Sequence, residues 1–228
     1  MADQTAEEAK NEYIQRMGEA LGTQFAALWQ EVAHLHMKWA EYVALFGTKP
    51  SRIELLNKAA PSFFRLVQDT LWEETLLHIA RLTDPSESGK GKPNLTIRNL
   101  PKLVDDAATR TVLGELVAVA VKQTEFCRDW RNRHIAHRDL KLALDGEAEP
   151  LLDASRRQVN LALETLTSMQ NAVRAHYMKS ESYFRLGRGA GGAVSLLYVL
   201  DDGLRADAER IERLSRGEFA EVDFARDL

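Results

Sequence analysis

The sequence predicts an all-α fold, and three observations carry this prediction. Apolar residues recur at spacings of three and four along most of the 228 residues, as on one face of a helix. Helix-capping signals precede several of these periodic stretches, and glycine or proline follows them. No stretch alternates apolar and polar residues as a half-buried strand does. We therefore expect a helical protein with a long N-terminal helix and an extra C-terminal helix.

Two capping boxes and a proline locate the helices of the N-terminal half. Thr5 with Glu8, and Ser51 with Glu54, form the boxes, because a hydroxyl residue precedes a glutamate by three positions. Gly47 lies between the boxes and ends the first helix. The helices expected here run from Thr5 to about Phe46, from Ser51 over a short stretch, and from Pro61 to about Thr83.

The C-terminal half begins with a loop at residues 84–94, which is rich in Ser, Gly, Pro and Lys. A glycine-rich linker, Gly187–Gly192, precedes the last helix, and the chain ends in an acidic tail. We divide the chain into a helical domain, residues 1–180, and a C-terminal appendage, residues 181–228. The helices expected here run from Thr96 to about Asp106, from Thr109 to about His134, from Ser155 to Lys179, and from Ala193 to Arg216.

The composition excludes several classes of protein. Hydrophobic residues make up 45% of the chain and charged residues 28%, which excludes a fully disordered or collagen-like chain. The single cysteine, Cys127, excludes an intramolecular disulfide and a Cys-rich zinc site. No apolar run approaches ~18 residues and the N-terminus lacks an apolar core, so neither a transmembrane helix nor a signal peptide is expected. We expect a cytoplasmic protein.

The charge distribution allows one basic region. The net charge of −4 argues against a globally basic nucleic-acid-binding surface. Residues 87–141 nevertheless carry eleven Lys and Arg against seven Asp and Glu. This basic middle segment could meet a phosphate backbone, and a mixed, solvated surface is the alternative interpretation.

The densest polar cluster lies at the end of the predicted helix 109–134. It spans residues 127–139, with the sequence Cys-Arg-Asp-Trp-Arg-Asn-Arg-His-Ile-Ala-His-Arg-Asp. Arg131 in this cluster continues the inward-facing stripe of Ala120, Thr124 and Cys127. A guanidinium on that face is costly unless it is paired or used. The cluster is therefore the strongest candidate for a functional site.

The residue types suit RNA cleavage without a metal ion. That reaction needs a base for the 2′-OH proton, an acid for the leaving 5′-oxygen and a fixed cation on the phosphate. Histidine suits the proton transfers because its ordinary pKa lies near neutrality. Arginine suits the phosphate because it stays charged and binds bidentately. Arg131, His134 and His137 have these residue types. The alternative is a surface helix end, where cations favour the helix dipole and histidine caps carbonyl groups.

The segment Arg131-Asn132-Arg-His-Ile-Ala-His137 resembles the Arg-polar-xxxx-His signature of the HEPN superfamily (higher eukaryotes and prokaryotes nucleotide-binding domains). The wider context resembles its abortive-infection U-type, or AbiU2-like, branch. The supporting features are an aromatic first helix, LLHIARLTDP before a loop, Asn94-Leu-Thr, and WRNRHIAHRDL. The resemblance covers about residues 10–180. It implies an up-and-down helical bundle that dimerises, so that motifs from two protomers meet in one cleft.

The resemblance also implies roles for the motif residues. Many members are metal-independent RNases of toxin–antitoxin, abortive-infection or CRISPR-linked defence, whereas many relatives are inactive binding modules. Arg131 would bind phosphate and stabilise the transition state. Asn132 would have a positioning role, and His137 would be the acid–base residue. Independently of the resemblance, we expect Arg133 and His134 to be supporting residues. Some family toxins carry, two residues after the histidine, a tyrosine that a partner enzyme adenylylates. Asp139 stands at that position here, so that form of control is not expected.

Helix geometry leaves the acid–base residue open. At ~100° per residue, Arg131 and His137 point ~120° apart on a straight helix. Either the helix ends before His137, or the cleft is completed across a dimer. The pairs that share a face of a straight helix are Arg131 with His134 and Arg133 with His137. His134 therefore remains a rival to His137.

Three other patterns are weaker candidates. Gly187–Gly192 matches GxGxxG, but a helix and not a strand is predicted upstream, so we expect a linker and no dinucleotide site. His34 and His36 do not converge on a helix, so no metal site is expected there. Glu74 and His78 lie four residues apart and are expected to form a satisfied buried pair.

The expected function is that of a metal-independent endoribonuclease in a bacterial defence system, of the toxin–antitoxin or antiviral abortive-infection type. It would cleave RNA at a composite site in a homodimer. The alternative is a non-catalytic dimeric HEPN-like module that binds RNA, a nucleotide or a protein partner. No cofactor, metal ion or membrane partner is expected, and a cognate antitoxin is a further candidate partner.

Overall fold

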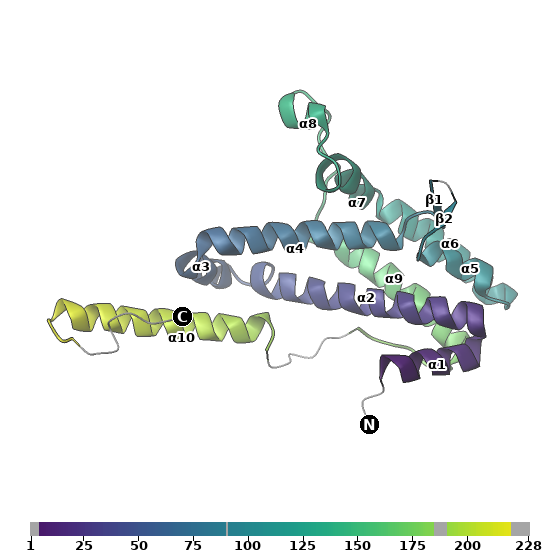
Figure 1. Ribbon diagram of the computed structural model, residues 1–228, viewed down its shortest axis with the longest axis horizontal. Coiled ribbons are helices and arrows are strands. Elements are labelled where there is room, and N and C mark those ends of the chain that lie inside the picture. The colour runs from purple at the N-terminus through teal and green to yellow at the C-terminus, as the bar shows by residue number, and fades with distance from the viewer. Residues whose placement is uncertain (1–4, 90, 185–190, 220–228) are drawn as a thin grey trace. The chain divides into compact units, whose positions relative to one another are not determined.

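The computed structural model describes residues 5–89, 91–184 and 191–219, and helices dominate them (Figure 1). The prediction of an all-α fold is confirmed. The helices are α1 (Ala6–Met17), α2 (Glu19–Phe46), α3 (Pro50–Ala59), α4 (Pro61–Leu82), α5 (Leu100–Leu103), α6 (Ala107–Gln123), α7 (Glu125–Trp130), α8 (Leu140–Leu144), α9 (Arg156–Tyr177) and α10 (Ala193–Ser215). A 3-10 turn, η1 (Ile97–Asn99), precedes α5, and a π turn, η2 (Arg131–Ile135), follows α7.

The helices form two compact units. The first comprises residues 1–39 and 71–185, and the second comprises residues 40–70 and 186–228. Helices α2 and α4 each contribute to both units, because the unit boundaries fall within them. The predicted domain division at residue 180 stays a prediction.

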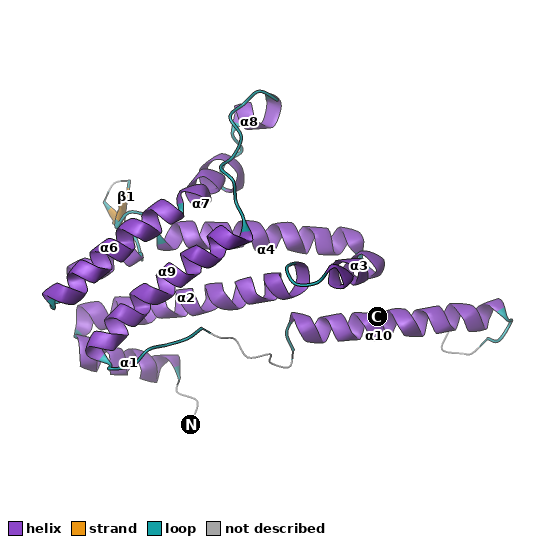
Figure 2. Cartoon of the chain, turned by 180° about the vertical axis from the view of Figure 1, so that it is seen from behind, coloured by secondary structure: helices purple, strands orange, loops and turns teal. Residues whose placement is uncertain are grey.

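The core of the first unit lies between parts of α2 and α4 and the helices α6 and α9 (Figure 2). The indole Nε1 of Trp39 on α2 donates to Oδ1 of Asn160 on α9 at 2.7 Å. Burial of a large apolar side chain contributes about 1.5–3 kcal/mol, so such a core stabilises the helices together. Its large, fully buried side chains include Leu21, Phe25, Leu28, Leu35, Leu76, Ile79, Leu113, Leu166 and Met169.

The predicted continuous N-terminal helix is wrong, because Gly18 divides it into α1 and α2. Gly18 has φ +81°, which glycine adopts without strain and other residues rarely adopt. The two helices approach closely at Gly22, where an added Cβ atom would lie 2.6 Å from the Ile14 Cα atom. The predicted capping box at the start of α1 is confirmed, since Glu8 N donates to Thr5 Oγ1 and Thr5 N donates to the Glu8 carboxylate.

The second predicted capping box, at Ser51, is wrong. Helix α3 begins at Pro50, with Lys49 as a cap that has no side-chain hydrogen bond, so Ser51 does not cap it. Proline is well suited to the first helical position because the N–H that it lacks would be unpaired there. The predicted start of α9 is confirmed, since the Ser155 hydroxyl accepts a hydrogen bond from Gln158 N.

The predicted helix from Thr109 to His134 is divided in the structure. It begins earlier, because the Asp106 carboxylate caps α6 by accepting from Thr109 N at 2.7 Å. It breaks at Thr124, whose buried hydroxyl lies 2.8 Å from Ala120 O and 3.1 Å from Thr83 Oγ1. Helix α7 and the π turn then carry the polar cluster.

The predicted loop at residues 84–94 holds a minimal antiparallel hairpin. Strands β1 (Glu87–Ser88) and β2 (Lys92–Pro93) pair there, with Glu87 opposite Pro93. The predicted helix after it is shorter than expected, because η1 and α5 end at Leu103 and Asp106 already caps the next helix.

The second unit packs α10 against α3 and against parts of α2 and α4. Its buried apolar side chains are Leu45, Leu56, Phe64, Ala193 and Leu197. The Glu41 carboxylate accepts a hydrogen bond from Ala193 N at 2.5 Å, at the start of α10. A Cβ atom on Gly192 would lie 2.7 Å from Glu41 Oε1, so a larger residue there would displace the Glu41 carboxylate. Most of the predicted linker (residues 187–190) and most of the acidic tail (residues 220–228) lie outside the described residues.

No helix in the described part of the chain combines the length and the hydropathy needed to cross a membrane.

Candidate functional site

The candidate motif lies where α7 ends in a π turn. Ala136 N donates to Arg131 O at 2.8 Å, which is the i to i+5 pattern of a π turn, a feature frequent at functional sites. Asp139 then caps α8, because its carboxylate accepts from Leu142 N at 2.9 Å. The helix therefore ends before His137, which is the first of the two arrangements that helix geometry left open.

Arg131 is a largely buried cation with a carboxylate partner. Its side chain is 23% exposed, and its NH1 atom lies 2.6 Å from both Oδ1 and Oδ2 of Asp84, whose side chain is 21% exposed. Its Nε donates to Oδ1 of the exposed Asn132 at 3.0 Å. The cost of the guanidinium on the inward face is thus offset by a charged partner and an amide.

Two further arginines contact the residue before Asp84. Arg98 Nε donates to Thr83 O at 2.9 Å, and Arg128 NH1 lies 3.4 Å from Thr83 Oγ1. Burial, and then the positive charge of Arg98, lowers the pKa of Arg128. Three guanidinium groups therefore gather around this turn, and the carboxylates of Asp84 and, near Arg128, of Glu125 oppose them, so positive charge is in excess there.

The imidazole of His134 is engaged on both sides. Its Nε2 lies 3.2 Å from Glu73 Oε1, and its Nδ1 lies 3.0 Å from Arg138 NH1. Arginine has only donors, so we assign Nδ1 as an acceptor and Nε2 as the protonated nitrogen that donates to Glu73. His134 is thereby held by a partner at each ring nitrogen.

His137 differs from His134 in its surroundings. Its side chain is exposed, and within residues 5–89, 91–184 and 191–219 it makes no hydrogen bond and no ion pair. An imidazole with both nitrogens open can accept or donate a proton.

Arg133 holds a loop and does not face an open site. Its guanidinium lies 3.3 Å from Asp129 Oδ1 and donates to Glu149 O at 2.5 Å and to Pro150 O at 3.2 Å. Trp130 Nε1 donates to the next part of the same loop, at Leu152 O. These contacts attach the segment before α9 to α7.

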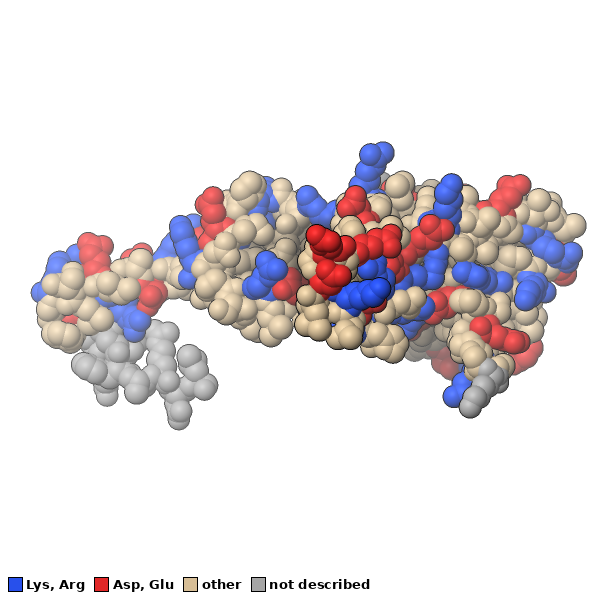
Figure 3. All heavy atoms as spheres, turned by 90° about the horizontal axis from the view of Figure 1, so that it is seen from above, with Lys and Arg blue, Asp and Glu red and all other residues tan. Residues whose placement is uncertain are grey.

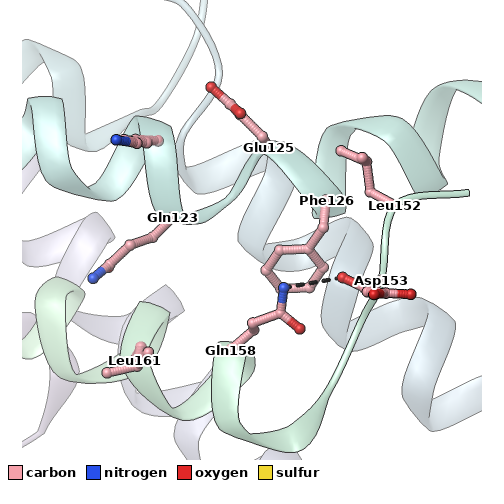
Figure 4. Close-up of a pocket in the computed structure, with 8 residues that line it drawn as sticks. Gln123, Glu125, Phe126, Leu152, Asp153, Gln158 and Leu161 are labelled. Atoms are coloured by element: carbon pink, nitrogen blue, oxygen red, sulfur yellow. Dashed lines mark hydrogen bonds between the residues drawn. The ribbon is translucent and has the colours of Figure 1, made fainter.

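A pocket of about 500 Å³ lies beside that loop, and the sequence did not predict it (Figure 4). It is bounded by the end of α6, the start of α7 and the start of α9, and Gln158 Nε2 donates to Asp153 O across it. The predicted site residues do not line it. Its lining residues are Lys122, Gln123, Glu125, Phe126, Leu152, Asp153, Gln158 and Leu161.

The prediction that Glu74 pairs with His78 is wrong, because each residue pairs with a different side chain. His78 is 1% exposed, and its Nε2 lies 2.8 Å from Glu31 Oε2, while Glu74 pairs with Lys38 and Arg81. Burial is the main reason that the pKa of His78 is lowered to about 4. The two histidines of His34-x-His36 belong to no group of three metal-binding side chains, and the described residues contain no such group.

Basic and acidic side chains are interspersed on the face of the molecule shown in Figure 3. No field of a single sign covers that face, so the basic count of residues 87–141 does not amount to a continuous basic surface there.

Sequence reasoning missed Asp84 and Glu73 as partners of the motif. Asp84 precedes Arg131 by 47 residues, and Glu73 precedes His134 by 61. No local spacing links residues so far apart. The one available signal was that a buried arginine requires a carboxylate, without an indication of which one.

An all-helical unit that carries Arg131-Asn132-x4-His137 at the end of a helix has the features of a HEPN-type domain. The AbiU2 family model of HEPN domains matches residues 18–187, which is well over half of the chain, and the chain therefore belongs to this family. No curated protein and no solved structure matches the chain significantly.

Proposed function

We propose that this AbiU2 family member is a metal-independent endoribonuclease of a bacterial defence or toxin–antitoxin system. The proposal is supported by a fixed cation at the end of a helix and an open histidine six residues further along the chain. Arg131 is held by Asp84 and Asn132, and His137 lies beyond the helix, exposed and without a described partner.

The reaction would use these two side chains in separate roles. The His137 imidazole accepts the 2′-OH proton, and the 2′-oxygen attacks the phosphorus. The Arg131 guanidinium binds the non-bridging oxygens, on which negative charge develops. The 5′-oxygen leaves with a proton from a second imidazole, which the His137 of a second copy supplies in a composite dimer site. The products are a 2′,3′-cyclic phosphate and a 5′-hydroxyl.

One observation favours a second function. Arg131 NH1 is already bound to both oxygens of Asp84, as expected of an arginine with a structural role. The alternative is therefore a non-catalytic dimeric module that binds RNA, a nucleotide or a protein partner. In that case His137 would be dispensable.

Cleavage of total cellular RNA by purified protein in EDTA separates the two functions. The wild type is compared with R131A and H137A, and with the matched controls R65A and H176A, which alter an exposed arginine and a partly exposed histidine away from the motif. The endoribonuclease requires cleavage that R131A and H137A lose and both controls retain. RNA binding without cleavage supports the module.

The dimer is tested by light scattering after size exclusion. A homodimer has twice the chain mass of 25.7 kDa. If the site is composite, specific activity falls when the protein is diluted below its dimer dissociation constant. A monomer that retains full specific activity contradicts the composite site.

A further inference from the structure

Asp84 is the closest charged neighbour of the phosphate-binding candidate, and it comes from a different part of the chain. We infer that Asp84 is a positioning residue, which fixes the Arg131 guanidinium so that its NH2 group is left for the substrate phosphate. This inference rests on the proposed endoribonuclease function.

The hydrogen bonds of the Arg131 guanidinium support this role, because they engage two of its three nitrogen atoms. A guanidinium has five N–H groups on three nitrogens. Nε is bound to Asn132 Oδ1 at 3.0 Å, and NH1 is bound to both Asp84 oxygens at 2.6 Å. NH2 has no partner in the described residues. The contacts with Asn132 and Asp84 thus set the plane of the guanidinium and leave one nitrogen open.

Asp84 is itself fixed through its backbone. The buried Thr96 hydroxyl lies 2.7 Å from Asp84 O and 2.9 Å from Leu82 O. Arg98 Nε binds the preceding carbonyl, Thr83 O, at 2.9 Å. These hydrogen bonds join the turn before the hairpin, residues 82–84, to the segment after the hairpin, Thr96 and Arg98. A carboxylate on such a turn has little room to move.

The same facts argue against the opposite role, in which Asp84 occupies the phosphate site and must leave before RNA binds. Departure of Asp84 would leave Arg131, Arg128 and Arg98 together without this carboxylate, at a site where the Arg131 side chain is only 23% exposed. Like charges in a partly buried site repel strongly. Asp84 therefore stays, and the phosphate binds beside it.

The experiment is steady-state cleavage of a defined RNA by D84N and D84E, with D69N as the matched control, since Asp69 pairs with Arg65 on exposed surface. Misplacement of a catalytic group by ~1 Å can cost about 10²-fold in rate. We expect kcat of D84N to fall 10- to 100-fold with KM changed less than threefold. D84E, which keeps the charge but moves it, should lie between D84N and wild type, and D69N should match wild type.

A second measurement does not depend on cleavage. In nitrogen-15 NMR spectra, restricted rotation of the Arg131 guanidinium should give separate NH1 and NH2 signals in the wild type, which average in D84N. Unchanged rotation in D84N overturns the inference. An unchanged kcat in D84N also overturns the inference, because Asp84 then has no role in catalysis. Faster cleavage by D84N, or tighter binding of an uncleavable 2′-O-methyl RNA, overturns it as well, because Asp84 then competes with the phosphate. If the wild type cleaves no RNA, the proposed function fails, and the NMR comparison alone decides the positioning role.

Discussion

His134 Nε2 and Glu73 Oε1 lie 3.2 Å apart and join the π turn to helix α4. The other imidazole nitrogen lies 3.0 Å from Arg138 NH1, so His134 links two elements and neither of its ring nitrogens is open. This relationship separates the two histidines of the motif, which sequence spacing alone left as rivals. It predicts that they respond differently to mutation.

The first prediction concerns H134Q. Glutamine retains one hydrogen bond, so we expect RNA cleavage within about threefold of wild type and a loss of stability of about 1 kcal/mol, the usual net value of one hydrogen bond. Urea unfolding and cleavage rates measure the two effects. A loss of cleavage as large as that in H137A would identify His134 as the acid–base residue instead.

The second prediction concerns the loss of folding stability at low pH. Burial lowers the pKa of both His36 and His78 to about 4 in the folded protein. The unfolded chain, with a histidine pKa near 6.5, binds more protons between these values, so stability falls as pH drops from about 6.5 toward 4. For His78 the loss between pH 7 and pH 5 should be about 1–2 kcal/mol. H78Q should flatten the dependence of unfolding free energy on pH, and an unchanged slope in H78Q contradicts this account.

The third prediction tests the crossing of α1 and α2. In G22A the new Cβ atom would lie 2.6 Å from backbone atoms of Ile14, which cannot yield as a side chain can. Overpacking of this kind costs about 1–3 kcal/mol. Gly114 on α6 is the matched control, because nothing lies within 4 Å of its added Cβ, and G114A should stabilise by roughly 0.5–1 kcal/mol. Equal melting temperatures for the two variants would contradict the close crossing.

The fourth prediction tests the start of α10. In G192A the added Cβ meets Glu41 Oε1 at 2.7 Å, which should displace the carboxylate from Ala193 N. Hydrogen exchange at residues 193–197 should therefore become faster. G203A on the same helix has open space around its added Cβ and should leave that exchange unchanged or slower. Faster exchange in both variants would mean that the Glu41 contact does not hold the helix.

The sequence was sufficient for the fold class and for most of the helices. Periodicity and capping residues are local signals, and Thr5, Ser155 and Pro61 begin helices where predicted. The differences from the predicted helices have two causes, a local backbone conformation and a tertiary contact. Gly18 breaks a helix that periodicity continues, and Thr124 breaks another because its hydroxyl bonds to Thr83.

The candidate site was predictable in its residues and not in its geometry. Arg131 lies on the inward stripe and was expected to need a partner, as the structure shows. The identity of that partner depends on a contact across 47 residues. The π turn, which ends the helix before His137, has no sequence signature that distinguishes it from an α-helical turn.

The most direct test of the proposed activity is the chemistry of the RNA ends. A defined RNA is incubated in EDTA with wild type or H137A, beside the same RNA carrying a 2′-deoxy sugar at the cleaved position. We expect a 2′,3′-cyclic phosphate and a 5′-hydroxyl from the wild type alone, and no cut at the deoxy position. Cleavage of the deoxy substrate, or equal cleavage by H137A, would contradict the proposed activity.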